Sequence, residues 1–276
     1  MSAPSLDAQA VVVVTMCSEA RLRHVRAQQR LLEEWAPEAG RVVVWLDDAE
    51  APPFDGAIVV RVPPGRHGLR LAAGRNAGAR AAIEAGGRVL VFLDADCVPG
   101  RSLVGSYAEA AARLPEALLV GAVTYLAEGV GVGDGSRLDE LTRPHPARPA
   151  PAPGTLSRSG EYSLFWSLSF AVTAATWERV GGFDEAYEGY GGEDTDFAYG
   201  ARDLGVPLVW VGGADAYHQH HPTSSPPWQH LDDILRNGRI FAQRWGAWPM
   251  GGWIDAFADA GAIVPSASRG WVRAAG

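Results

Sequence analysis

The sequence predicts an α/β protein in which a doubly wound, mostly parallel sheet with flanking helices forms a single domain. This prediction rests on short runs of β-branched residues, helix-length amphipathic segments between them, and acidic residues directly after the apolar runs. With 276 residues, 47% of them hydrophobic, the chain can bury a large core. The formal net charge of −8 argues against nucleic acid as a partner, although a nucleotide ligand is compatible with it.

Strand and helix patterns alternate through the N-terminal half. Buried strands are predicted at 11–15, 41–46, 57–62 and 88–93, with helices between them at 18–35 and 69–84. A further helix is predicted at 102–114 and a further strand at 117–125. Ser102 is the expected N-cap of the third helix. The apolar run 10–16 is too short for a membrane span and lacks the basic flank of a secretory signal, so it is predicted to be a strand.

The alternation stops after residue 126. Residues 127–160 contain repeated Gly and a Pro-rich stretch without an apolar period, which predicts a long loop that serves either as a lid or as a passive linker. A helix is predicted to begin near Glu193, with Phe197, Ala201 and Leu204 on one face, and a strand is predicted at 206–211. The segment after Pro222 holds five of the ten Trp residues, so we expect it to pack on the main domain.

Acidic residues follow two of the predicted strands, at the edge of the sheet where ligands bind in such folds. Asp47 and Asp48 follow the second strand, and Asp94 and Asp96 follow the fourth. On an extended backbone Asp94 and Asp96 would point to the same side and reach one ion. Hard oxygen ligands suit Mg²⁺ or Mn²⁺, so the pair predicts a metal site, although short acidic triplets also occur by chance in surface turns.

A second acidic cluster, Glu193, Asp194 and Asp196, follows a Gly turn at the start of a predicted helix. Carboxylates at a helix N-terminus are ordinary capping groups, which explains one acid better than three. Glycines in the turn also allow backbone and ligand to approach closely. These residues therefore favour a functional role.

Three histidines, His218, His220 and His221, follow the last predicted strand. An exposed or core histidine cluster is the structural alternative, but imidazole is a good ligand for Mn²⁺ and could join Asp96 at the strand ends. The sequence leaves open which of the three would bind metal. With only Cys17 and Cys97, no disulfide framework is expected, which favours a reducing compartment, the cytoplasm; peripheral contact with a membrane stays open.

These segments together resemble the GT-A nucleotide-sugar glycosyltransferases of the family 2 type, with the C-terminal motif of β-1,4-galactosyltransferases and chondroitin-polymerising enzymes. The resemblance covers 11–222 and rests on VVVVT, VVVWLDD, AAGRNAGARAA, VLVFLDADCVPG, VGGFDEAYEGYGGEDTDFAYGARDLG and AYHQ, in the family's order. It implies a GT-A domain at 1–222, with a nucleotide-binding half at 1–126 and an acceptor and catalytic half at 161–222. Residues 223–276 would then form a Trp-rich extension that completes the acceptor side.

The resemblance also implies a role for individual residues. The positions matched to nucleotide and donor binding are Thr15, Asp47, Asp48, Arg70, Arg75 and Asp94. Asp94, Asp96 and His218 match the site of a divalent cation, Mn²⁺ or Mg²⁺. Glu193 matches an acceptor-contacting residue, and Asp194 matches the base that deprotonates the acceptor hydroxyl. Tyr190 stands where many relatives have Trp, a difference that affects stacking against the acceptor. The first strand continues Met-Cys-Ser rather than the usual Pro-x-Tyr/Phe-Asn, a difference that affects stacking of the nucleotide base.

The implied reaction transfers a sugar from a nucleotide-diphosphate sugar, expected to be a UDP-sugar, to a hydroxyl of a carbohydrate, lipid-linked or small-molecule acceptor. A single displacement would invert the anomeric carbon. Two alternatives remain: a sugar-nucleotide nucleotidyltransferase, and a catalytically silent sugar-binding module of the same fold. The first would need a Gly/Arg/Lys-rich loop where this chain has Cys17, Ser18 and Glu19, and the second would lack a base or a metal ligand.

Overall fold

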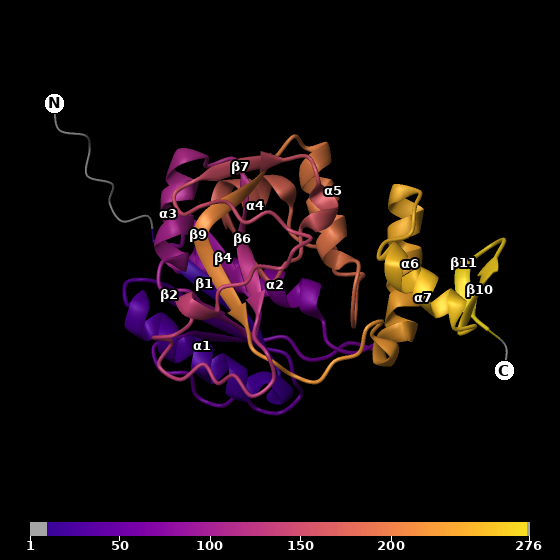
Figure 1. The fold of residues 1–276 in the computed structure, drawn as a ribbon, viewed down its shortest axis with the longest axis horizontal. Helices are drawn as coiled ribbons and strands as arrows, with labels where there is room; N and C mark the ends of the chain where they lie inside the picture. The colour runs from indigo at the N-terminus through magenta and orange to yellow at the C-terminus, as the bar shows by residue number, and fades with distance from the viewer. Residues whose placement is uncertain (1–9, 275–276) are drawn as a thin grey trace.

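A nine-stranded mixed sheet forms the centre of the protein in the computed structural model, which describes residues 10–274 (Figure 1). The strand order is β3-β2-β1-β4-β8-β6-β9-β5, and β7 pairs with β9. The strands are β1 Val11–Cys17, β2 Gly40–Trp45, β3 Ile58–Arg61, β4 Val89–Leu93, β5 Cys97–Pro99, β6 Leu118–Tyr125, β7 Leu156–Ser159, β8 Ser169–Thr173 and β9 Leu208–His218. The helices around it are α1 Leu22–Trp35, α2 Leu71–Glu84, α3 Leu103–Arg113, α4 Ala174–Val180 and α5 Glu193–Asp203, with short 3-10 turns η1 Glu19–Arg21, η2 Asp139–Leu141 and η3 Tyr162–Leu164.

Most of the sheet runs in one direction. β1, β2, β3 and β4 pair in parallel, and β8 pairs antiparallel with both β4 and β6. Because β6 and β9 also pair in parallel, these six strands share one direction, whereas β5, β7 and β8 run against them. The predicted α/β class, with a doubly wound, mostly parallel sheet and flanking helices, is confirmed.

Side-chain alternation along β1 explains the two layers of helices. Val12 and Val14 pack into a core with α2, α4 and α5, whereas Val13 packs into a second core with α1 and α3. Successive strand residues point to opposite faces, so a continuous apolar strand buries both faces of the sheet. The run at 10–16, predicted to be a strand, is therefore a central strand of this sheet. Among residues 10–274, no helix is long and apolar enough to cross a membrane.

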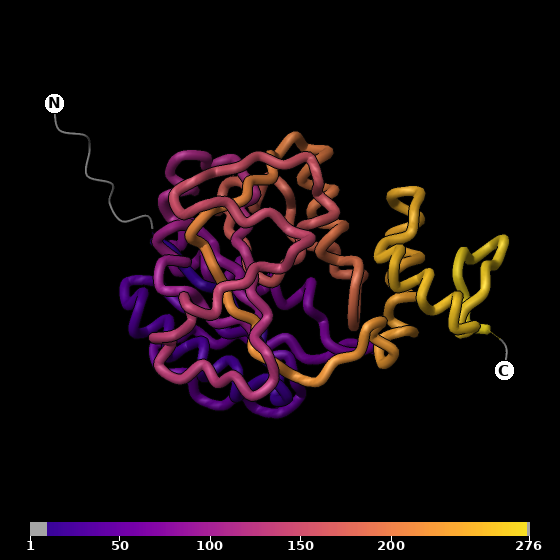
Figure 2. The backbone as a smooth tube through the Cα atoms, viewed as in Figure 1, coloured from indigo at the N-terminus to yellow at the C-terminus, as the bar shows by residue number. Residues whose placement is uncertain are grey.

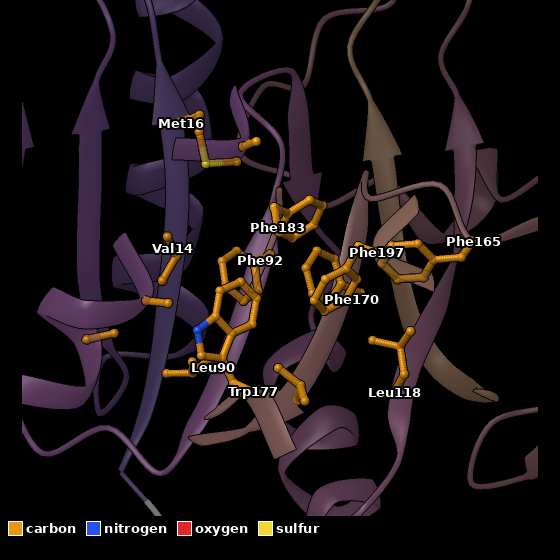
Figure 3. Close-up of a cluster of buried hydrophobic side chains, with 14 of the residues drawn as sticks. Val14, Met16, Leu90, Phe92, Leu118, Phe165, Phe170, Trp177, Phe183 and Phe197 are labelled. Atoms are coloured by element: carbon orange, nitrogen blue, oxygen red, sulfur yellow. The ribbon is translucent and has the colours of Figure 1, made fainter. Parts of the chain in front are cut away.

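The first core contains a group of packed aromatic rings, among them Phe92, Phe165, Phe170, Trp177, Phe183 and Phe197 (Figure 3). Phe92 of β4 stacks on Phe170 of β8 with ring centroids 4.5 Å apart, and Phe183 stacks on Phe197 of α5 at 4.3 Å. Offset stacked pairs of this kind add to the free energy gained by burial. Further ring contacts of Trp177 with Phe92 and Phe197, and of Phe170 with Phe197, link β4 and β8 to α5.

Two local predictions from the sequence, the buried third strand and the buried face at Leu204, are wrong. The third strand is an exposed edge rather than a buried strand, because β3 pairs only with β2; Ile58 is 45% exposed. Leu204 is exposed because it caps the end of α5, where the helical periodicity no longer applies. Ser102 occupies the N-cap position of α3, as predicted, although its side chain makes no capping hydrogen bond.

The segment 127–160 is more ordered than its composition predicted. Its last part forms β7, which extends the sheet beside β9, and Leu138 and Arg148 are buried. The polar, Pro-rich sequence gave no strand pattern here, because β7 is only four residues long and pairs with β9, which is distant in sequence. The prediction of an unpacked loop is therefore wrong for this part of the segment.

The C-terminal extension lies beside the sheet and carries its own small core (Figures 1 and 2). It consists of the 3-10 turn η4 Trp228–His230, helices α6 Leu231–Trp245 and α7 Gly251–Asp259, and the hairpin β10 Ile263–Ser266 and β11 Gly270–Arg273. Asp196 of α5 accepts hydrogen bonds from Arg244 (2.8 Å) and from the Trp245 indole (2.7 Å). Asn237, fully buried, donates to the Tyr190 carbonyl. The extension therefore forms hydrogen bonds both with the segment that precedes α5 and with α5 itself.

Close packing of α2 on the sheet gives a stability prediction. A Cβ at Gly78 would collide with Val14 and Val44, so Gly78→Ala should destabilise the protein by about 1–3 kcal/mol through overpacking. Gly105 in α3 has open space around it, so Gly105→Ala should gain up to about 1 kcal/mol from helix propensity. Urea unfolding of both variants measures the difference. Stabilisation by Gly78→Ala would contradict the close approach of α2 to β1.

Candidate functional site

Two adjoining cavities open at the carboxyl ends of β1, β4 and β9. We call the first, of about 680 Å³, the histidine cavity, because His218, His220, His221 and His230 line it together with Asp96. We call the second, of about 720 Å³, the aromatic cavity; its lining includes Tyr125, His145, Trp166, Tyr190, Trp253, Glu193 and Asp194. Both cavities share a lining of Leu71, Arg75, Asp94, Tyr125, Leu168 and Tyr190. They are therefore two halves of one cleft.

Asp96, His218 and His221 form a group in the histidine cavity that could hold a metal ion. One ligand atom from each residue lies within 4.8 Å of the others. The Asp96 carboxylate is 3.3 Å from Nε2 of His218 and 3.1 Å from Nε2 of His221. One carboxylate oxygen and two imidazole nitrogens are a donor set that suits Mn²⁺. His220 is exposed and lies outside this group.

The protonation of these groups favours binding of a cation. Burial alone would raise the pKa of Asp96, but the hydrogen bond with His221 and the neighbouring side chains of His218 and Arg21 hold that pKa at about 2. Burial lowers the pKa of His218, which keeps its imidazole neutral and its lone pair available. Arg21 also lies 3.4 Å from Asp96, a contact that the sequence gave no reason to expect.

Backbone geometry corrects the predicted arrangement of Asp94 and Asp96. Residues 94–97 form a turn, in which the Cys97 N–H donates to the Asp94 carbonyl, rather than an extended strand. The Asp96 carbonyl accepts from the Gln219 N–H, and this bond ties the turn to the end of β9. The two carboxylates therefore have different partners, and Asp94 is not in the group that could hold a metal.

Asp94 instead belongs to a buried charge network around Arg75. The guanidinium of Arg75 is 2% exposed and lies 3.2 Å from both Asp94 and Glu193. It also sits over the Phe183 ring, 5.1 Å from the centroid. Burial raises the pKa of Asp94 to about 6 despite this pairing. Because both carboxylates occupy the guanidinium, Arg75 joins the strand end to α5 rather than presenting a free cation to a ligand.

Asp194 faces the aromatic cavity from the first turn of α5. Burial, followed by repulsion from Glu193, raises the pKa of Asp194 to about 7. Its carboxylate accepts a hydrogen bond from the Thr195 N–H at 2.7 Å. The N-cap position itself is Gly192, which makes no side-chain capping bond. Asp194 is therefore a carboxyl group that changes charge near neutral pH at the wall of a cavity.

Other residues singled out from the sequence lie outside both cavity linings. Thr15 is fully buried and its hydroxyl donates to Gln28 at 2.6 Å, so its side chain is unavailable to a ligand. Asp47 accepts from the Glu19 N–H, and Asp48 is exposed. Arg70 pairs with Glu185 at 3.4 Å. Sequence neighbours of these residues, Met16, Ser18, Leu46 and Leu69, do line the histidine cavity.

Asp196 has a different role from the one its sequence pattern favoured. Its carboxylate is buried at the interface with α6, where it holds Arg244 and Trp245. The sequence, with Glu193, Asp194 and Asp196 within four positions, did not indicate that Asp196 points away from the cleft. Helical geometry supplies the reason, because Asp194 and Asp196 project from different sides of α5.

Part of the chain is similar in sequence to known glycosyltransferases. Residues 155–221 match the family model described as the N-terminal domain of galactosyltransferase. A segment of 79 residues is 35% identical to validoxylamine A glucosyltransferase of Streptomyces hygroscopicus subsp. jinggangensis, covering 26% of this chain and 18% of that protein. The matched segment thus spans under a fifth of that relative.

Solved structures with the same fold cover most of the chain. GalNAc-T7, crystallised with UDP, GalNAc and Mn²⁺, superposes with a TM-score of 0.59 at 14% identity, over 87% of this chain and 49% of that one. TarS of S. aureus superposes with a TM-score of 0.54 at 12% identity, over 84% of this chain and 39% of that one. The fold is the GT-A fold of glycosyltransferases. The resemblance inferred from the sequence motifs is confirmed at this level.

The geometry of the histidine cavity predicts which histidines matter for metal binding. His221→Ala should weaken Mn²⁺ binding by at least about tenfold, since even changes behind the ligands cost roughly 10–100-fold at metal sites. His220→Ala, a matched change in an exposed neighbour, should leave the affinity unchanged. Calorimetric titration with Mn²⁺ measures both. Equal losses in the two variants would remove His221 from the proposed ligand set.

Proposed function

We propose that the protein is a metal-dependent glycosyltransferase of the hexosyltransferase type that moves a sugar from a UDP-sugar to an acceptor hydroxyl with inversion. The observation that carries this proposal is the shared cleft, in which the Asp96 group and Asp194 line adjoining cavities. UDP occurs in the similar structures of GalNAc-T7 and TarS, and Mn²⁺ occurs in the former. These ligands support the choice of donor and metal for this chain.

The histidine cavity would bind the donor. Asp96, His218 and His221 would hold Mn²⁺ or Mg²⁺, which when bound supplies the positive charge that a departing diphosphate needs. The nucleotide would lie against the strand ends near Met16, Ser18 and Leu46, with Asp47 and Asp48 at the rim. Asp94, at the boundary of the two cavities, would face the ribose or the sugar.

The aromatic cavity would bind the acceptor next to Asp194. In the proposed step, the acceptor oxygen forms a bond to the anomeric carbon while the bond from that carbon to UDP breaks, and its electron pair leaves with UDP. Asp194 accepts the proton of the attacking hydroxyl. Its raised pKa makes it a stronger base than an ordinary carboxylate. A single displacement of this kind inverts the anomeric carbon.

The C-terminal extension would complete the acceptor side. Met250, Gly251, Gly252 and Trp253 line the aromatic cavity, and Tyr190 stacks on His230 of the extension with ring centroids 4.5 Å apart. A flat aromatic face is a good partner for the apolar face of a sugar ring. We therefore propose that the extension completes the acceptor side through 250–253, while its His230 lines the donor cavity.

The activity itself is tested by incubating the protein with Mn²⁺ and a panel of UDP-, GDP- and TDP-sugars. We expect slow release of UDP from one UDP-sugar, abolished by a chelator and restored by Mn²⁺. Release of pyrophosphate from a nucleoside triphosphate and a sugar phosphate would identify a nucleotidyltransferase instead. Binding of UDP without turnover in the presence of acceptors would identify a silent module.

Replacing the proposed base separates catalysis from binding. Asp194→Asn keeps the size of the side chain and its acceptor for the Thr195 N–H, so folding and UDP affinity should survive. Turnover should fall by about 10²–10⁴-fold in kcat, the usual contribution of a general base. Asp203→Asn, the same change in an exposed residue at the end of α5, is the control and should retain full activity. A near-normal rate for Asp194→Asn would exclude this residue as the base.

The pKa of Asp194 gives a dependence on pH. Because the carboxylate form is the base, kcat should rise with pH and level off above about 7 in the native protein. Stability should show the opposite trend: the fold favours the protonated form, so this contribution is present at low pH and lost as the pH rises through about 7. Melting temperatures at pH 8 should therefore be equal or higher for Asp194→Asn. A lower melting temperature would contradict the buried setting of this carboxyl.

A further inference from the structure

The aromatic cavity has an excess of negative charge. Its charged lining consists of Arg75, Asp94, Glu193 and Asp194, with His145 as a further titratable group. The positive charge of Arg75 is shared between Asp94 and Glu193, at 3.2 Å from each. Among the described residues, Asp194 forms no salt bridge, although the charges of Arg75 and Arg148 act on it from a greater distance. An anionic group in this cavity would meet no free guanidinium among the described lining residues.

Arg148 lies close enough for its charge to act on Asp194, but its guanidinium is not part of the cavity lining. Its guanidinium is stacked between the indoles of Trp166 and Trp210, 5.0 and 4.8 Å from their centroids. All three of its nitrogens are buried and have no hydrogen-bond partner. Trp166, not Arg148, contributes to the cavity lining, so a ligand reaches an indole there rather than a cation.

Two groups of aromatic rings surround the carboxylates. Tyr125, His145 and Trp166 form a chain of edge contacts in the sheet domain, with centroid distances of 5.9 and 5.0 Å. Tyr190 and Trp253 form the second group, 6.0 Å apart, where the extension meets the sheet domain. Aromatic faces next to carboxylates attract a desolvated cation, because the ring quadrupole and the carboxylate act in the same direction.

From this combination we infer that the acceptor is a polyhydroxylated amine, whose ammonium lies beside Glu193, whose attacking hydroxyl lies beside Asp194, and whose ring lies against Trp253 or Trp166. The inference rests on the proposed function and names its acceptor class. The hydroxyls of such a molecule supply the attacking oxygen, and the ammonium supplies selectivity over neutral and acidic sugars. Repulsion by the surplus carboxylate excludes uronic acids and phosphorylated sugars.

The test compares three probes that share one ring and differ in charge: glucosamine, glucose and glucuronate. Their binding to the full chain with UDP and Mn²⁺ is measured by ligand-observed NMR in low and high salt. We expect glucosamine to bind about tenfold more tightly than glucose, with glucuronate weakest, and salt to reduce the preference. Equal binding of glucosamine and glucose, or preference for glucuronate, would overturn the inference.

Two variants test which residues cause the preference for glucosamine. Glu193→Gln removes one carboxylate and should reduce the preference for glucosamine while improving the binding of glucuronate. If loss of the Arg75 contact unfolds this variant, Trp253→Leu provides the second test: glucosamine affinity should fall severalfold. Trp228→Leu is its control, because Trp228 belongs to the same extension but does not line the cavity. Equal effects of the two Trp variants would contradict a role for Trp253.

Failure of this inference is distinct from failure of the proposed function. If the protein turns over a UDP-sugar and prefers neutral or acidic acceptors, only the acceptor class is wrong. If the panel of nucleotide sugars yields no turnover, the binding order of the three probes still tests the charge of the cavity.

Discussion

The buried guanidinium of Arg75 holds the cleft together. It extends from α2 and joins Asp94, at the end of β4, to Glu193, at the start of α5. A buried cation is costly unless its partners are well placed, and removal of either partner would leave a charge uncompensated. The pair of contacts therefore fixes the two halves of the cleft relative to each other. Asp96 and Asp194 each lie within two residues of one of these partners.

The segment before α5 is held from the other side by the C-terminal extension. Asn237 donates to the main chain at Tyr190, and Asp196 anchors the end of α6. The proposed base therefore sits between Arg75 in the sheet domain and a helix that lies beyond the matched family segment at 155–221. The Arg75 contact and the hydrogen bonds from the extension together restrain the first turn of α5, and restraint of this kind from two sides positions a functional side chain accurately.

Several local predictions failed for one shared reason: each depended on the identity of a distant partner. The triplet around Asp96 was expected to be extended, yet hydrogen bonds from Gln219 and within the turn bend it. The polar segment that contains β7 was expected to be a loop, yet β9 supplies an edge for it. Asp196 looked like a third site acid, yet α6 supplies Arg244. Local patterns do not contain these partners, so the sequence offered no signal for them.

By itself the sequence determined the α/β class, six of the nine strands of the main sheet and the residues at their ends, because period, apolar runs and turn residues are local properties; β5, β7 and β8 were not predicted. It also pointed to Asp96, Asp194 and the cluster that contains His218 as candidates for chemistry. Only the tertiary structure decided that His221 rather than Asp94 groups with Asp96 and His218, that Arg75 is occupied by two carboxylates, and that Trp253 reaches the cavity of Asp194. These arrangements depend on side chains from segments far apart in the chain, and the packing of the sheet, α5 and the extension sets their distances.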